Sequence, residues 1–99
     1  MSASAAQLRL RARVVGALRS VLDADGFCEV QTPLLAPATC PEIGLDSFEV
    51  TGGGYLVTST EYHLKRLAAR GLDKAYTLTS NFRRGEVSER HGPEFTMLE

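Results

Sequence analysis

Residues 81–99, NFRRGEVSERHGPEFTMLE, decide how this sequence is interpreted. Two β-favouring segments stand on either side of a charged loop over 84–92, so we expect a strand, a loop and a returning strand. Arg83, at the end of the first strand, presents a planar two-pronged donor that suits a phosphate or a carboxylate. His91 lies in the loop, and Phe95 on the returning strand offers a face on which an adenine can stack. The stretch therefore predicts either a nucleotide-binding hairpin or a hairpin with a solvated loop and a core phenylalanine.

The composition is typical of one small globular domain. The chain has 99 residues, 43% of them hydrophobic and 23% charged, which argues against both disorder and membrane insertion. Its 11 basic and 12 acidic residues give a net charge of −1, so a global basic field for gripping nucleic acid is absent. Cys28 and Cys40 form no C-x-x-C pair, which argues against a structural zinc site. We therefore assign no metal ligand in this sequence. Because no signal-peptide pattern opens the sequence, we expect a cytoplasmic protein.

The first half of the sequence predicts a helix, a strand and a connector. Apolar residues recur at helical spacing over 6–25, with arginines on the opposite face that we interpret as solvated, and Gly26 ends the pattern. Residues 27–32 alternate enough for a short strand, which Pro33 stops or confines to a sheet edge. Residues 34–47 contain further prolines and a glycine, so we expect an irregular connector there.

Three consecutive glycines, 52–54, punctuate the middle of the chain. They separate two β-favouring runs, 48–51 and 55–58, and therefore predict a hairpin with a permissive turn. A phosphate-cradling loop is the weaker alternative, because no G-K-[ST] follows the glycines.

Another helix and another strand precede the charged loop. Ser59 or Thr60 can cap a helix over 61–70, and β-favouring residues over 75–82 predict a strand. Helices mixed with hairpin strands indicate an α+β fold.

Three segments, in this order along the chain, resemble class II aminoacyl-tRNA synthetases of the lysyl, aspartyl and asparaginyl group. The helix followed by GFCEVQTPLL, about 8–35, is similar to motif 1, and TSTEYHLKRL, 58–67, resembles the segment that lines the amino-acid pocket. The stretch 81–99 resembles motif 2, with closest similarity to the lysine branch. The resemblance implies that 1–99 is a partial catalytic domain whose strands belong to a mixed, mainly antiparallel sheet flanked by helices.

The resemblance also implies roles for individual residues. Arg83 would be the catalytic residue, holding the α-phosphate of ATP and the carboxylate of the amino acid. His91 would meet the far end of the triphosphate, and Phe95 would stack on the adenine. Glu61 would bind the α-amino group of the substrate, and Glu99 would pair with a lysine-type side-chain ammonium.

Further positions bear on assembly and on adenine recognition. Pro33 belongs to the motif associated with the dimer interface, so we expect a homodimer. Where the family commonly has a carboxylate that contacts adenine, this sequence has Gly85; either Glu86 takes over that contact, or recognition relies on Phe95 and the backbone. Thr60 stands where the group often has proline.

The reaction implied by the resemblance is attack of an amino-acid carboxylate on ATP, which gives an aminoacyl-adenylate and pyrophosphate with the help of Mg²⁺. We expect motif 3 and the metal ligands beyond residue 99, and no anticodon-binding barrel before residue 8. That arrangement is similar to stand-alone enzymes that attach lysine or β-lysine to elongation factor P. The alternatives are a lysyl-tRNA synthetase fragment that charges tRNA, a non-catalytic dimerising paralogue, and an inactive truncated product.

Overall fold

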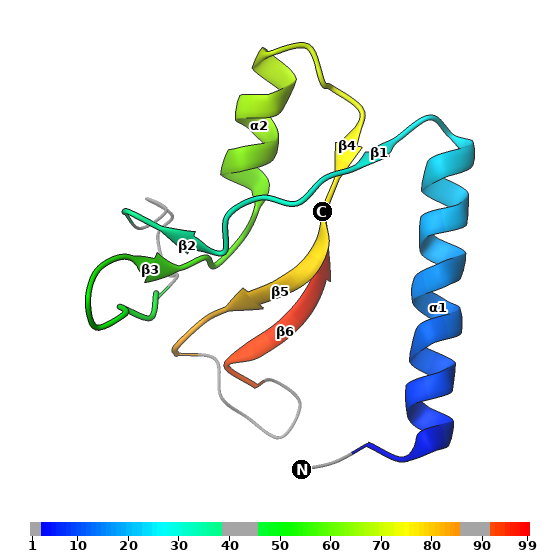
Figure 1. Ribbon diagram of the computed structural model, residues 1–99, viewed down its shortest axis with the longest axis horizontal. Coiled ribbons are helices and arrows are strands. Elements are labelled where there is room, and N and C mark those ends of the chain that lie inside the picture. Colours follow the sequence, from blue (N-terminus) through cyan, green and yellow to red (C-terminus); the bar gives the residue numbers. More distant parts are fainter. Residues whose placement is uncertain (1–2, 39–45, 86–91) are drawn as a thin grey trace.

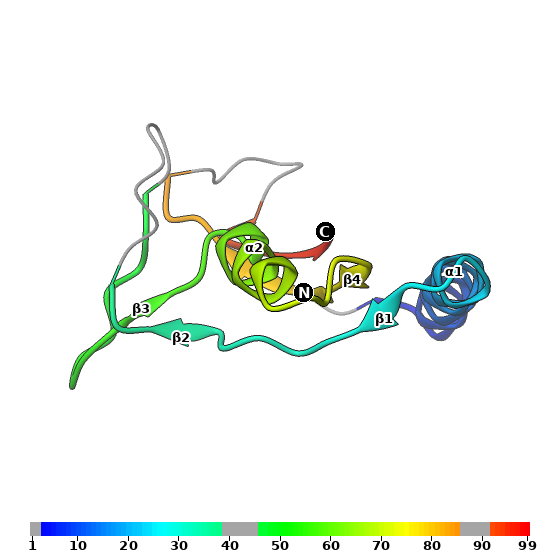
Figure 2. The same ribbon diagram turned by 90° about the horizontal axis from the view of Figure 1, so that it is seen from above.

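A computed structural model describes residues 3–38, 46–85 and 92–99 of the chain. Figure 1 shows its two helices and six short strands in the described parts. In chain order the elements are α1 (Ala5–Ala24), β1 (Cys28–Glu29), β2 (Leu35–Ala36), β3 (Tyr55–Leu56), α2 (Glu61–Ala69), β4 (Ala75–Tyr76), β5 (Leu78–Phe82) and β6 (Glu94–Leu98). Seen from above, α1 lies at one end of the molecule and the β2–β3 pair at the other (Figure 2). This α+β content agrees with the expectation from sequence.

The predicted N-terminal helix is confirmed, with bounds one residue earlier than expected. A capping box starts α1: the Gln7 amide donates to the Ser4 hydroxyl at 3.1 Å, and the Ser4 amide donates to the Gln7 side chain at 2.8 Å. Both bonds satisfy amide donors that the first turn leaves without helical partners. Gly26 follows the helix with φ 83°, a conformation that only glycine adopts easily. Gly26 therefore turns the chain from α1 toward β1.

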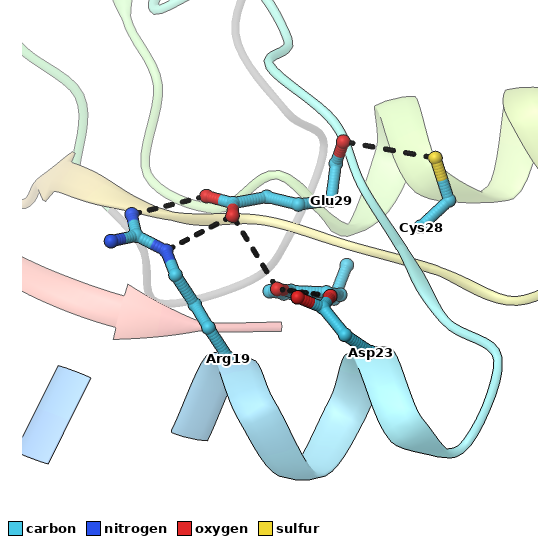
Figure 3. Close-up of polar contacts among 5 residues, drawn as sticks. Arg19, Asp23, Cys28 and Glu29 are labelled. Carbon is cyan, nitrogen blue, oxygen red and sulfur yellow. Dashed lines mark hydrogen bonds and ion pairs between the residues drawn. The ribbon is translucent and has the colours of Figure 1, made fainter. Parts of the chain in front are cut away.

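A polar cluster fixes the C-terminal end of α1 to the β1–β4 pair (Figure 3). The guanidinium of Arg19 donates two hydrogen bonds, of 3.0 and 3.1 Å, to the carboxylate of Glu29. The hydroxyl of Tyr76 donates to Asp23 at 3.2 Å and lies 3.4 Å from Glu29. Tyr76 is 2% exposed. Burial first, and then hydrogen bonding and charge from Asp23 and Glu29, raise the pKa of Tyr76 to about 12.

The strands of the described part form three two-stranded sheets. β1 runs parallel to β4, whereas β2–β3 and β5–β6 are antiparallel. The strand expected over 75–82 divides at Thr77 into β4 and β5. Thr77 nevertheless continues the β5–β6 ladder, because its backbone exchanges hydrogen bonds of 2.9 and 3.0 Å with Glu99. The single mixed sheet implied by the resemblance is thus present as separate pairs in the described residues.

The triple-glycine turn forms, and the runs on either side of it pair with each other as predicted, over a short stretch. Gly52, Gly53 and Gly54 all have positive φ, and the Val50 amide donates to the Gly54 oxygen at 2.9 Å. The run expected over 48–51 meets β3 through an antiparallel bridge between Glu49 and Tyr55. β3 also pairs with β2, which lies inside the segment expected to be irregular. Alternation along a single run cannot reveal such a distant partner.

Candidate active site

The most deeply buried part of the described chain is polar. Among the described residues, the buried hydrophobic ones are Val57 and Tyr76. The buried polar ones are more numerous: Thr58, Ser59, Thr60, Thr77 and Asn81. Buried polar groups are costly unless they find partners. A cluster of this kind therefore indicates either an internal hydrogen-bond network or a surface built for a polar ligand.

The cluster forms because the chain before α2 runs antiparallel to β5. The Phe82 amide donates to the Val57 oxygen at 2.8 Å, and at the other end the hydroxyls of Thr60 and Thr77 lie 2.5 Å apart. Helix α2 starts at the next residue, Glu61. The N-terminus of α2 thus meets the end of the β5–β6 hairpin.

Glu99 lies at this meeting point and accepts three hydrogen bonds on its carboxylate. Oε2 accepts from the Ser59 hydroxyl at 2.6 Å. Oε1 accepts from the Thr60 amide at 2.8 Å and from the Thr60 hydroxyl at 3.1 Å. A carboxylate near the first amides of a helix is also favoured by the positive end of the helix dipole. Local donors and the helix end together fix the orientation of the Glu99 side chain.

Glu61 belongs to the same corner of the molecule. Its amide donates to the Ser59 hydroxyl oxygen at 3.0 Å, so Ser59 links the backbone of Glu61 to the carboxylate of Glu99. The Glu61 side chain is 52% exposed and forms an ion pair with Lys65 at 3.1 Å. Ser59 therefore connects the backbone of Glu61, not its side chain, to the fixed Glu99 carboxylate, and the Glu61 carboxylate is half-exposed.

Arg83 and Phe95 meet at the other end of the hairpin. The guanidinium carbon lies 5.2 Å from the centre of the Phe95 ring, within cation–π distance. The Nε atom donates to the Thr58 main-chain oxygen at 3.2 Å, and the Arg83 amide donates to the Pro93 oxygen at 2.9 Å. Both side chains are half-buried. Arg83 is thus held against the strand at its backbone and at its side chain.

The two ends share one face of the hairpin. Side chains alternate between faces along a strand, so Thr77 and Asn81 point to the same side, as do their partners across the ladder, Glu99 and Phe95. Four residues separate the two levels, or about 13 Å at the usual rise per residue. One face therefore presents a fixed carboxylate at one end and a guanidinium with an aromatic ring at the other.

Sequence reasoning missed the residues that connect these two ends. Thr77 lies opposite Glu99 and Asn81 lies opposite Phe95, and both are fully buried. Within the described part of the chain, Asn81 Oδ1 and Thr58 Oγ1 have no hydrogen-bond partner. The signal available was polar residues at alternate positions of the strand, 77, 79 and 81. Without the location of 57–60, that signal also fits an exposed strand face.

The remaining predicted site residues belong to the loop that follows β5. Glu86 and His91 lie outside the described residues, as does most of the loop between β5 and β6. Gly85 is exposed, and its neighbour Arg84 forms a bidentate ion pair with Asp46, with the shortest contact 2.9 Å. The loop roles assigned from the resemblance stay predictions.

A hollow of about 310 Å³ adjoins the site. Its walls are Leu56, Val57, Thr58 and Ser59 with Tyr62, His63 and Arg66 of α2, together with Ala36, Pro37, Ala38 and Ser47. Glu99, Arg83 and Phe95 do not line it. Within residues 3–38, 46–85 and 92–99, no group of three potential metal ligands occurs and no helix is long and apolar enough to cross a membrane.

Comparison with known proteins places this chain in a family. The family described as tRNA synthetases class II (D, K and N) matches residues 1–99. The chain therefore belongs to the class II tRNA synthetases of this group. Over an alignment length of 107, it is 42% identical to the elongation factor P–(R)-β-lysine ligases of Sodalis glossinidius and Pectobacterium carotovorum. Each alignment covers 99% of this chain and 33% of the relative, so the chain spans about a third of the length of these proteins.

Proposed function

We propose that this chain supplies part of an ATP-dependent ligase site that activates lysine or a lysine-like amino acid as an aminoacyl-adenylate, for transfer to elongation factor P. The observation that carries the proposal is the shared face of the β5–β6 hairpin, with Glu99 at one end and Arg83 against Phe95 at the other. The similarity to elongation factor P–(R)-β-lysine ligases supports the choice of amino acid and acceptor.

Each end of this face has chemistry suited to one part of the reaction. Glu99 pairs with the side-chain ammonium of the amino acid, and Glu61 takes its α-amino group by exchanging the solvent-exposed ion pair with Lys65. Arg83 then directs its guanidinium at the substrate carboxylate and the α-phosphate while Nε stays on Thr58. These contacts place the carboxylate oxygen in line with the phosphorus, so no side-chain nucleophile is required.

ATP requires recognition of its base as well as its phosphates. The Phe95 ring lies beside Arg83, so adenine and α-phosphate can be bound next to each other at the loop end of the hairpin. When bound, Mg²⁺ neutralises phosphate charge; its ligands are expected beyond the described residues. Glu86 and His91 are proposed to complete the contacts to the nucleotide from the loop.

A homodimer is the proposed assembly. Helix α1 has no buried residue within the described structure, and one stripe of it is apolar and exposed: Leu10 at 54%, Val14 at 51%, Leu18 at 37% and Val21 at 69%. Pro33 is also exposed, next to Leu34 and Leu35, which are 37% and 51% exposed. Apolar side chains spaced i, i+4, i+8 and i+11 form a continuous strip that a second copy can cover.

ATP–pyrophosphate exchange tests the activation step. We expect the chain, with Mg²⁺ and lysine or (R)-β-lysine, to exchange pyrophosphate into ATP above the level of the Arg83→Ala variant. Arg84→Ala is the matched control, because Arg84 is an adjacent arginine whose partner is Asp46. Equal exchange by the folded parent chain and Arg83→Ala would contradict the proposal. Mass spectrometry of elongation factor P and of tRNA after incubation with the amino acid then decides between those two acceptors.

A further inference from the structure

The hydroxyl protons around Glu99 have a fixed direction. Carboxylate oxygens only accept hydrogen bonds, whereas each hydroxyl has a single proton. The Thr60 hydroxyl donates to Glu99 Oε1, so its 2.5 Å contact with Thr77 must use the proton of Thr77. The Ser59 hydroxyl likewise donates to Glu99 Oε2 and accepts from the Glu61 amide. Two short relays therefore end on the carboxylate, one on each oxygen.

These relays leave the carboxylate little acceptor capacity. Two oxygens offer about four acceptor positions. Thr60 fills both positions on Oε1, with its amide and its hydroxyl, and Ser59 fills one position on Oε2. With the described residues counted, one position, on Oε2, is left for a ligand.

We propose that Thr60 is the positioning residue that makes the Glu99 carboxylate a single-pronged acceptor, selective for a primary ammonium over a guanidinium. An ammonium is a compact donor that needs one acceptor, whereas a guanidinium binds a carboxylate best through two parallel bonds to both oxygens. With Oε1 saturated by Thr60, the two-pronged arrangement is blocked. This inference rests on the proposed function, in which Glu99 receives the side chain of the amino-acid substrate.

Binding of L-lysine and L-arginine, followed by calorimetry, tests the selectivity. Thr60→Val keeps the shape and the amide but removes the hydroxyl bond to Oε1. We expect the preference for lysine over arginine to fall on the order of tenfold, as for one hydrogen bond. Thr60→Ser restores the hydroxyl and should restore the preference. The matched control is Thr96→Val, because the Thr96 hydroxyl bonds Arg11 on the opposite face and its loss should leave the preference unchanged.

A second measurement tests the geometry without any ligand. In ¹⁵N–¹H spectra of the protein without ligand, the Thr60 amide should respond to Glu99→Gln, because its hydrogen bond to Oε1 then loses a charged acceptor. An unresponsive Thr60 amide would overturn the positioning role, even if lysine binds. Equal loss of lysine and arginine affinity in Thr60→Val, or a serine variant that behaves like the valine variant, would overturn the selectivity. Failure of the parent chain to bind either amino acid, with the amide response intact, would instead overturn the proposed function and the selectivity that rests on it.

Discussion

The guanidinium of Arg83 lies over the ring of Phe95, 5.2 Å from its centre, while its Nε donates to the backbone of Thr58. This contact joins the residue assigned to the phosphate and the residue assigned to the adenine into one unit. The bond from Nε to the backbone and the contact with the ring both restrict rotation of the Arg83 side chain. In the proposed function, this restriction preorganises Arg83 for an anion.

Replacing Arg83 tests that preorganisation. We expect Arg83→Ala to lower the rate of pyrophosphate exchange by about 10²–10³, the usual effect of removing one preorganised donor to a developing charge. Arg83→Lys should recover little of this rate, because an ammonium keeps the charge but lacks the planar fork. Arg84→Ala should exchange at the parental rate. Recovery of most of the rate by Arg83→Lys would show that charge alone suffices.

Phe95 should contribute to the affinity for ATP through stacking. Phe95→Ala is expected to weaken ATP binding by about 1–3 kcal/mol, the range for base stacking on an aromatic side chain. Phe95→Tyr keeps the ring and should keep the affinity. Calorimetric titration with ATP, and with inorganic triphosphate as a ligand without a base, measures the effect. A similar loss of affinity for both ligands would mean that Phe95 acts through Arg83 rather than through the adenine.

The sequence was sufficient to predict elements whose determinants are local. Helix α1 follows from its apolar periodicity and from Gly26 at its end, and the β5–β6 hairpin follows from two β-favouring runs around a charged loop. The proximity of Arg83 and Phe95 then follows from strand register, since Asn81 pairs with Phe95. Local patterns were therefore sufficient to bring Arg83 and Phe95 together, whereas their roles stay predictions.

The other end of the site depends on contacts between distant residues. Ser59 and Thr60 meet Glu99 across 40 and 39 positions of sequence, and Thr60 meets Thr77 across 17. From the sequence, Ser59 and Thr60 are ordinary candidates for a helix cap. Their burial follows from the position of 57–60 beside β5, which the sequence does not reveal. The pairing of β2 with β3 was missed for the same reason. The positions of 57–60 and of β2 are thus set by pairing between distant segments, which local propensity does not predict.

Gly54 should be the least replaceable residue of the triple-glycine turn. It has φ +91°, and an added Cβ would lie 2.9 Å from Leu35 Cδ1 and 3.0 Å from the Ala36 oxygen. Gly53 has φ +127°, but its added Cβ would have no heavy atom within 4 Å in the described structure. Both alanine variants should lose about 1 kcal/mol from the positive φ, and Gly54→Ala should lose more. Urea unfolding of the two variants makes the comparison; equal loss would contradict the close approach of β2.

The exposed stripe of α1 should control association. Val21 is its most exposed member, at 69%. We expect Val21→Asp to shift the chain from dimer to monomer in sedimentation velocity, because a desolvated aspartate opposes burial of the stripe. Ser20→Asp makes the same change in charge one position off the stripe and should leave the dimer intact. A parent chain that is monomeric at all accessible concentrations would contradict the proposed assembly.

Tyr76 should make the stability of the fold depend on pH in the alkaline range. Its pKa is raised from 10.0 to about 12 by burial and by the neighbouring Asp23 and Glu29. Folding therefore favours the neutral phenol: this stabilisation is fully present below about pH 10 and is lost as the pH rises toward 12. In Tyr76→Phe no phenol titrates at this position, so the free energy of unfolding should fall less steeply between pH 10 and 12.

The control for this prediction is Tyr62→Phe, because Tyr62 is 55% exposed and its ring is kept. Urea unfolding at a series of pH values, with absorbance at the phenolate band recorded in parallel, reports stability and ionisation together. The ionisation step near pH 12 should disappear in Tyr76→Phe and persist in Tyr62→Phe. The same alkaline loss of stability in the parent and in Tyr76→Phe would show that the cluster of Figure 3 holds α1 without help from the phenol proton.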